Sequence, residues 1–380
     1  MGMTIRLSLL LFVCASFGFC GAQKRDKNQP PPQFKAGMTA RVFHPKAQRN
    51  WRGAEHQELR VTVWYPAAEN AVETQQVIAS PNAPLFLAGK AAEHAAMAPE
   101  LEKLPLIVLS HGTGGSAMQM AWLGTALARA GFIAAAVNHP GNNTLEPYTA
   151  DGFVLWWERA TDLSEVIDGM LADPEFGPKI DQDRIGAAGF SIGGYTVLLL
   201  GGARTDISVL VDLCNKQPDA SVCHVPQMEE MGTPEQMLAA VRKTSGVSLA
   251  RSNESYRDPR VHAIFAIAPA VGMTLTHESL RAMRVPVDIV VGSADPMATP
   301  KDNADPIRAQ IRGAKETVLP NVAHYTFLDT CTAQGKKGLG EFCEDPPSVD
   351  REQVHAQVAG MAVEFFERAL QESGGFHLKL

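Results

Sequence analysis

The sequence predicts an α/β fold with a mostly parallel central sheet flanked by helices. Most of its apolar runs are short and show no alternation with polar residues, as expected of strands buried on both faces of a parallel sheet. Stretches with helical spacing lie between several of these runs, and alternating strands and helices are typical of layered α/β proteins. Near the end of the chain, residues 350–371 predict a long amphipathic helix that packs on one face of the sheet.

The expected elements can be placed in order along the chain. Seven apolar runs predict strands, at residues 58–66, 104–112, 132–141, 184–191, 261–269, 285–295 and 315–324. The intervening helices are expected at residues 117–131, 160–173, 195–203 and 303–314.

Two segments break this alternation. Residues 67–100 are polar and rich in Ala, and residues 204–258 contain little strand pattern. The second segment is too long for an ordinary loop. We therefore expect a helical, lid-like insertion between the helix at 195–203 and the strand at 261–269.

Composition limits the classes of function. The 380 residues are 45% hydrophobic and 20% charged, which is typical of a globular chain with one large domain, or two. The formal net charge is −7, and no run of Lys and Arg provides a binding surface for nucleic acid or anionic membranes. We expect the partner to be a small molecule and no nucleic acid.

The first 22 residues have the order of a secretory signal: one Arg, an apolar stretch and then small residues. The apolar stretch is short for a membrane span. We expect cleavage after Ala22, a disordered linker at 23–33 and a domain at 34–372, in a periplasmic or secreted protein without a stable membrane anchor. The alternative is a lipoprotein or an uncleaved anchor, but neither Cys14 nor Cys20 follows a small residue.

Four cysteines remain after such a cleavage: Cys214, Cys223, Cys331 and Cys343. An even number in an exported chain favours disulfides, and pairing Cys214 with Cys223 and Cys331 with Cys343 closes the shortest loops. Each bond would contribute roughly 2–4 kcal/mol. A zinc site would need closer spacing, so we expect no metal.

A serine between glycines lies at the junction of an expected strand and an expected helix. Residues 189–194 read GFSIGG, so Gly189, Ser191 and Gly193 form a GxSxG pattern. In a strand-turn-helix elbow of this kind the serine is strained and its hydroxyl is exposed at the edge of the sheet. The context predicts that Ser191 is a nucleophile, and the alternative is a packing turn of small residues.

A serine nucleophile needs a general base that is held by an acid. In this arrangement the chain order is serine, acid, histidine. Asp295 ends an apolar run, and His324 lies in a loop that follows the next one, so we expect these two residues to complete a triad. Asp212, which follows another apolar run, is the alternative acid.

Hydrolysis also needs donors for the negative oxygen of the intermediate. We expect the backbone amide of Ile192, directly after the nucleophile, and that of Thr113, in the glycine-rich loop SHGTGGSA, to supply them. The alternative for this loop is a merely flexible segment. His111 and His139 end earlier runs, and we interpret them as residues that orient loops rather than as bases.

The motifs LSHGTGG, VNHPGNN, DRIGAAGFSIGGYT, VPVDIVVGSADP and VAHYTFLDTC occur in this order. Together they resemble exported bacterial α/β-hydrolases known as predicted dienelactone hydrolases, which are related to the platelet-activating factor acetylhydrolases. The resemblance runs from about residue 34 to 370 and implies an α/β-hydrolase fold. Dienelactone hydrolases proper use a cysteine nucleophile, and Ser191 in this chain argues against the lactone activity in that name. Acetylhydrolases of this group can place their acid earlier, which is why Asp212 is considered.

We therefore expect a serine esterase that cleaves carboxylic esters with short or medium acyl chains through an acyl-enzyme, without a cofactor. One alternative is a peptidase or amidase of the prolyl oligopeptidase type, and another is a non-catalytic binding protein with the same fold. His139, Trp156, Trp157 and Tyr325 are candidates for the substrate pocket, although aromatic residues in such helices more often belong to the core.

Overall fold

The computed structural model describes residues 33–45, 58–223, 228 and 231–373. The expected signal segment at 1–22 and nearly all of the expected linker at 23–33 therefore lie outside the described residues. Among the described helices, none is long and apolar enough to cross a membrane.

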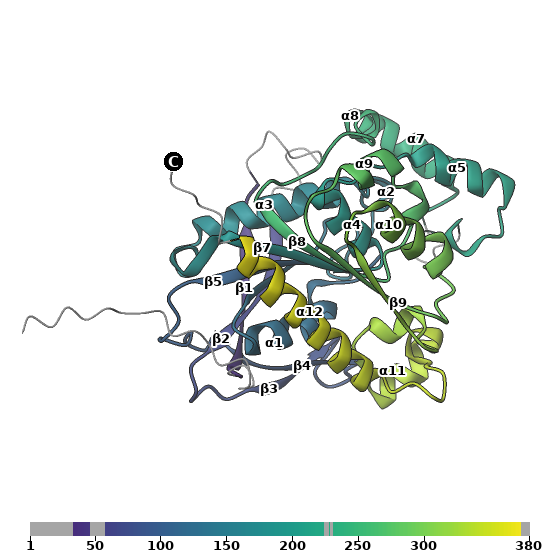
Figure 1. The fold of residues 1–380 in the computed structure, drawn as a ribbon. Helices are drawn as coiled ribbons and strands as arrows, with labels where there is room; N and C mark the ends of the chain where they lie inside the picture. Colours follow the sequence, from purple (N-terminus) through teal and green to yellow (C-terminus); the bar gives the residue numbers. More distant parts are fainter. Residues whose placement is uncertain (1–32, 46–57, 224–227, 229–230, 374–380) are drawn as a thin grey trace, which may run out of the picture. The chain divides into compact units, whose positions relative to one another are not determined.

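A sheet of eleven strands organises the described chain (Figure 1). The strands are β1 (Lys35–Phe43), β2 (Leu59–Ala67), β3 (Thr74–Ile78), β4 (Phe86–Glu93), β5 (Leu104–Ser110), β6 (Ile133–Val137), β7 (Ile180–Phe190), β8 (Val261–Ile267), β9 (Val287–Gly292), β10 (Lys315–Leu319) and β11 (Thr330–Cys331). Their order is β10-β9-β8-β7-β5-β6-β2-β1-β4-β11, and β3 pairs with β4.

The six strands from β6 to β10 in this order run parallel, whereas β2 and β1 continue the sheet in antiparallel pairing. Every residue of β5 and β6 is buried, because helices cover both faces of this region. The mostly parallel, helix-flanked α/β fold expected from the sequence is confirmed. Parallel pairing places the carboxyl ends of β7, β9 and β10 at one edge, where the candidate site lies.

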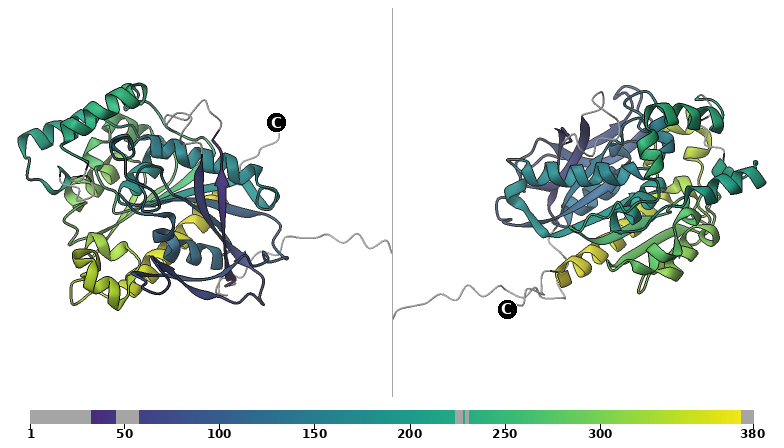
Figure 2. Two further views of the ribbon diagram at one scale, coloured as in Figure 1. Left: turned by 180° about the vertical axis from the view of Figure 1, so that it is seen from behind. Right: turned by 90° about the horizontal axis from the view of Figure 1, so that it is seen from above.

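Helices occupy both faces of the sheet. They are η2 (Ala117–Met120), α1 (Ala121–Arg129), α2 (Ala150–Val154), α3 (Glu158–Ala172), η3 (Gly177–Lys179), α4 (Ile192–Gly201), α5 (Ile207–Lys216), η4 (Ser221–Cys223), α7 (Pro234–Thr244), α8 (Gly246–Ala250), η5 (Gly272–Thr274), α9 (His277–Ala282), η6 (Pro300–Asp302), α10 (Ala304–Gln310), η7 (His324–Phe327), α11 (Ala333–Gly338), η8 (Gly340–Cys343) and α12 (Arg351–Ser373). The C-terminal α12, yellow in Figures 1 and 2, packs with α1 against one face, and α3 packs with α4 against the other.

The segment from 204 to 258 contains the short helices α5, η4, α7 and α8. Several contacts tie them to the rest of the fold: α7 packs on α2, α5 contacts η5, and the indole of Trp157 donates a hydrogen bond to the hydroxyl of Ser248 in α8. The insertion is therefore anchored over α2 and α3.

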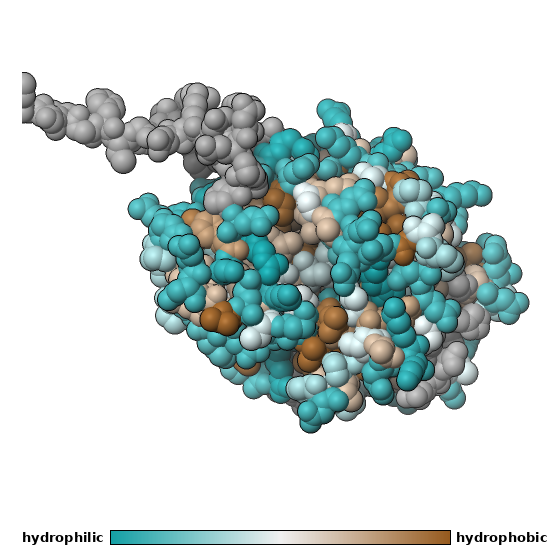
Figure 3. Space-filling view, turned by 90° about the horizontal axis from the view of Figure 1, so that it is seen from below, coloured by the Kyte–Doolittle hydropathy of each residue, from teal (hydrophilic) through white to brown (hydrophobic). Residues whose placement is uncertain are grey.

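The N-terminal part of the sheet contains strands that the sequence did not predict. β1, β3 and β4 include many exposed or half-buried residues, so they carry no continuous apolar signal. The predicted strand at 315–324 ends earlier, at Leu319, and His324 begins the short helix η7. On the face shown in Figure 3, hydrophilic side chains predominate and hydrophobic ones form small separate patches.

Candidate active site

Ser191 occupies a strained turn between β7 and α4. Its backbone has φ 59° and ψ −122°, a conformation that costs energy for any residue except glycine. A Cβ at Gly189 would lie 2.2 Å from the carbonyl oxygen of Gly193, and a Cβ at Gly193 would lie 2.0 Å from that of Ser110. Both glycines are therefore required by the close approach of backbone to backbone.

The structure brings the three expected triad residues together. Nε2 of His324 lies 2.9 Å from the hydroxyl oxygen of Ser191, and Nδ1 of His324 lies 2.6 Å from Oδ2 of Asp295. The other carboxylate oxygen of Asp295 accepts hydrogen bonds from the backbone amides of Met297 and Ala298. The carboxylate is thereby fixed in direction, and it holds the imidazole with Nε2 free to accept the proton of the serine.

The alternative acid lies elsewhere. Asp212 belongs to α5 of the insertion, where its side chain is exposed. Asp295, in contrast, is only 3% exposed and follows β9, next to the strand that leads to His324. A partner for the histidine is thus provided by Asp295 and not by Asp212.

Both residues expected to form the oxyanion hole border the same cavity as Ser191. Thr113 follows β5, and Ile192 is the first residue of α4, where the backbone amide has no acceptor within the helix. The loop that contains Thr113 is fixed by neighbouring side chains: the amide of Gly114 donates to Asn142 at 2.7 Å, and Tyr148 donates to the carbonyl of Gly114 at 3.0 Å. These hydrogen bonds hold the loop in place despite its glycines.

A second polar network lies behind this loop. His139 contacts Ser110 through Nε2 at 2.9 Å and Asp162 through Nδ1 at 2.8 Å, and all three side chains are buried. His111 donates a hydrogen bond from Nδ1 to the carbonyl of Gly112, and its Nε2 accepts one from the backbone amide of His139. Burial lowers the pKa of His111 well below its ordinary value, and the positive charge of Arg159 is the second cause. The ring therefore stays neutral.

Two of the residues expected to line the pocket lie outside it. His139 was a candidate because it follows a strand, but its ring faces the buried network. Trp157 is completely buried against the core and bonded to Ser248, whereas its neighbour Trp156 does line the cavity. Tyr325 also lines the cavity, as expected, and burial raises its pKa to about 12.

The cavity above Ser191 has a volume of about 680 Å³ and is mostly apolar. Parts of the chain far apart in sequence form its walls, and these parts include Val77, Ile78, Leu85 and Phe86 of the β3–β4 hairpin, Val222 of the insertion, and Leu339 and Phe342 near the C-terminus. These walls could not be predicted from the sequence, because the hairpin lies in a polar stretch and the loop around Phe342 has no periodicity. A cavity of this size and lining suits a small apolar molecule.

Two disulfides join the cysteines in the expected pairs, Cys214 with Cys223 and Cys331 with Cys343. The first links α5 to η4 within the insertion, and the second closes the loop that carries Phe342. Within the described residues, no group of three His, Cys, Asp or Glu side chains is arranged to hold a metal ion.

Comparison with known proteins gives two family matches. The model of the alpha/beta hydrolase family matches residues 107–333. The model of platelet-activating factor acetylhydrolase, isoform II, matches residues 34–152.

Curated relatives and solved structures add to this. Two cutinases of Thermobifida alba, est1 and est2, are each 31% identical over 109 residues, which is 28% of this chain. The chain spans only 33% of their length. Among solved structures, a ferulic acid esterase from Streptomyces cinnamoneus superimposes with a TM-score of 0.58 at 22% identity, covering 91% of this chain and 93% of that one, which shows the shared fold.

Proposed function

This chain belongs to the alpha/beta hydrolase family, and from that premise we propose that it is a serine hydrolase that cleaves carboxylic esters through an acyl-enzyme. The observation that carries the proposal is the continuous contact from Ser191 through His324 to Asp295 at the wall of an apolar cavity. The partial similarity to two cutinases supports an ester as the substrate.

The reaction begins when the hydroxyl of Ser191 attacks the ester carbonyl while His324 accepts its proton at Nε2. Asp295 keeps the proton of Nδ1 in place and stabilises the imidazolium that forms. The amides of Thr113 and Ile192 bind the negative oxygen of the tetrahedral intermediate, where two such donors are worth roughly 3–4 kcal/mol each. His324 then protonates the departing alcohol, and water hydrolyses the acyl-serine by the same steps.

The substrate is proposed to carry a short or medium acyl chain. The lining around Ser191 is mainly apolar, which suits an apolar acyl chain. The cavity volume of about 680 Å³ limits the combined size of the acyl and alcohol halves of the ester. The mechanism draws on side chains and backbone amides alone and uses no metal or organic cofactor.

We further propose that the protein is exported. Two disulfides suggest an oxidising environment, which the periplasm and the exterior of the cell provide. The signal segment expected at 1–22, with cleavage after Ala22, would direct it there. Sequencing the N-terminus of the mature protein tests this directly, since an intact Met1 would contradict cleavage.

Labelling with a fluorophosphonate probe tests the nucleophile. The folded protein should react once, and peptide mapping should locate the label on Ser191. Absence of labelling would favour a non-catalytic binding protein. A panel of p-nitrophenyl esters from acetate to palmitate, next to a lactone and a peptide amide, then tests the reaction class, because faster cleavage of the amide would indicate a peptidase.

A further inference from the structure

Three aromatic rings contact one another in succession beside the nucleophile. The ring of Tyr325 meets the imidazole of His324 edge to face at a centroid distance of 5.5 Å, and the ring of Phe342 lies 4.6 Å from that of Tyr325. All three residues line the cavity that contains Ser191. The row is therefore a continuous aromatic wall that starts at the catalytic imidazole.

The chemistry proposed above determines which half of an ester meets this wall. In the acylation step the C–O bond of the ester breaks, and Nε2 of His324 gives its proton to the departing alcohol oxygen. That oxygen must lie within hydrogen-bonding distance of Nε2, so the rest of the alcohol lies beside the imidazole. The carbonyl oxygen points instead to the amides of Thr113 and Ile192.

We infer that Tyr325 and Phe342 form the binding surface for the alcohol half of the ester, and that Phe342 is the residue that selects flat, aromatic alcohols. The inference rests on the proposed function and names part of its substrate class. Aromatic faces and edges attract one another beyond the effect of area alone. An aryl group that leaves with the alcohol gains such contacts, whereas an ethyl group does not reach them.

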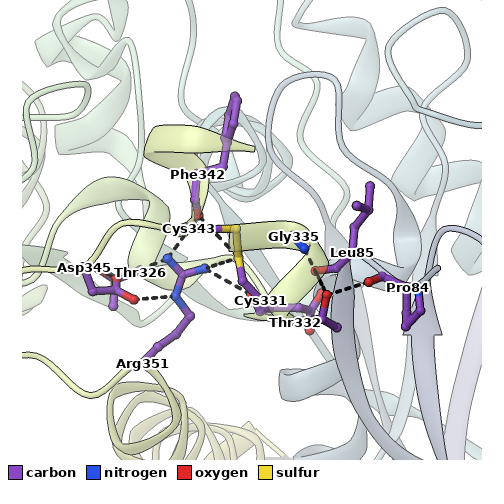
Figure 4. Close-up of a disulfide and its surroundings, with 11 residues drawn as sticks. Pro84, Leu85, Thr326, Cys331, Thr332, Gly335, Phe342, Cys343, Asp345 and Arg351 are labelled. Carbon is purple, nitrogen blue, oxygen red and sulfur yellow. Dashed lines mark hydrogen bonds and ion pairs between the residues drawn. A yellow bond between two sulfur atoms is a disulfide. The ribbon is translucent and has the colours of Figure 1, made fainter. Parts of the chain in front are cut away.

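The position of Phe342 is fixed by a buried arginine (Figure 4). Arg351, at the start of α12, donates from Nη2 to the carbonyl of Phe342 at 3.0 Å and from Nη1 to the carbonyl of Asp329 at 3.1 Å. Its charge is paired with Asp345 through Nε at 2.9 Å. Arg351 is 6% exposed, so these bonds are shielded from water. Arg351 therefore joins the loop of Phe342 to the segment that follows His324.

The same loop is attached at two further points. Cys343, next to Phe342, forms the disulfide with Cys331. Thr332 donates from its hydroxyl to the carbonyl of Pro84, and its amide donates to the carbonyl of Leu85, which also lines the cavity (Figure 4). A wall that is held at both ends loses little conformational freedom when a substrate binds, and this favours selectivity.

Acetate esters of three alcohols of similar basicity test the inference: ethanol, benzyl alcohol and 2-naphthylmethanol. Phe342→Ala should lower kcat/KM for the naphthylmethyl ester about tenfold more than for the ethyl ester, with the benzyl ester between them. Phe342→Leu, which keeps most of the volume, should show the same order with smaller factors. All three esters give the same acetyl-enzyme, which no longer contains the alcohol. The deacylation rate should therefore be the same for the three esters, and the same in the variants as in the wild type.

Leu145→Ala is the matched control. Leu145 also lines the cavity, but its segment is bonded to the loop of Thr113, since the amide of Thr144 donates to the carbonyl of Gly115 at 2.8 Å. This variant should leave the ratio between the three alcohols unchanged. Arg351→Lys should alter the ratio in the same direction as Phe342→Ala, and its deacylation rate should stay that of the wild type.

Two results would overturn the inference. One is an equal loss for all three alcohols in Phe342→Ala and Phe342→Leu. The other is a change of preference along p-nitrophenyl acetate, butyrate and hexanoate, which would assign Phe342 to the acyl half. Failure of the proposed function looks different, because the wild-type protein would then hydrolyse none of these esters and would not react with the fluorophosphonate.

Discussion

The hydroxyl of Ser110 lies 2.9 Å from Nε2 of His139, the same separation as between Ser191 and Nε2 of His324. Asp162 completes the first group at Nδ1 of its histidine, as Asp295 completes the second. Within the described residues the same three-residue arrangement thus occurs twice, with its two serines at the carboxyl ends of the neighbouring strands β5 and β7. Ser191 and His324 line the cavity, whereas Ser110 is fully buried at the end of β5.

The first prediction separates these two serines. Ser191→Ala should lower kcat by about 10⁴–10⁶-fold with the fold intact, as the loss of a triad serine does elsewhere. Ser110→Ala should keep fluorophosphonate labelling and most of the activity, and should cost about 1–3 kcal/mol of stability because its buried partners His139 and Arg159 lose a hydrogen bond. Steady-state kinetics and urea denaturation of both variants provide the measurement. A Ser191→Ala variant with a tenth of wild-type activity would contradict the prediction.

The second prediction concerns the acid. Asp295→Asn should lower kcat by about 10³–10⁴-fold, because an amide no longer fixes the tautomer of His324. Asp212→Asn should change kcat less than about tenfold, since Asp212 is exposed on α5. Kinetics of the two folded variants with one p-nitrophenyl ester decide between them, and the opposite ranking would move the acid to Asp212.

The third prediction follows from His355 in α12. Its ring stacks on Trp122 at 4.6 Å and donates from Nε2 to the carbonyl of Thr326 at 3.0 Å. Burial, assisted by the charge of Arg351, lowers the pKa of His355 from 6.5 to about 4. The unfolded chain therefore binds a proton at a higher pH than the folded chain does. This contribution to stability is complete above pH 6.5 and is lost as the pH falls towards 4.

The lost contribution amounts to about 3 kcal/mol between these two pH values. His355→Gln should remove this pH dependence, so that the difference in unfolding free energy between wild type and variant narrows by about that amount from pH 7 to pH 4. Urea denaturation at both pH values measures it. Parallel pH curves for the two proteins would show that His355 titrates normally in the folded state.

The fourth prediction compares the two disulfides. Replacing Cys331 and Cys343 by Ser should lower Tm by roughly 5–10 °C, given about 3 kcal/mol for a loop of this length. It should also reduce activity, because the loop between the two cysteines carries Phe342 and begins shortly after His324 in the sequence. The matched change at Cys214 and Cys223, within the insertion, should affect activity less. Equal activity losses in both double variants, measured after peptide mapping of the wild-type bonds, would contradict this.

The residues around the nucleophile could be placed from the sequence because their geometry allows few residue types. Gly189 and Gly193 leave no room for a side chain, and the turn at Ser191 interrupts an apolar run at a recognisable point. Asp295 and His324 likewise follow apolar runs, so the parallel sheet brings them to one edge. The chemistry of the candidate site was thus encoded locally.

The surroundings of the site were not encoded in this way. His139 follows a strand just as Asp295 does, and only packing decides that its ring faces the layer behind the cavity. Trp156 and Trp157 are adjacent, yet one lines the cavity and the other is buried beside α8. β3 and β4 pair antiparallel at the border of the sheet with mixed exposure, so neither strand shows a continuous apolar run.

Parts of the cavity wall lie on either side of residues 107–333, the stretch that the alpha/beta hydrolase model matches. Val77 and Phe86 precede this stretch, and Leu339 and Phe342 follow it, whereas Ser191 lies near its middle. Ser191, Asp295 and His324 thus lie inside the matched stretch, whereas part of the cavity wall lies outside it. Changes confined to these flanking segments would reshape the cavity and leave Ser191, Asp295 and His324 unchanged.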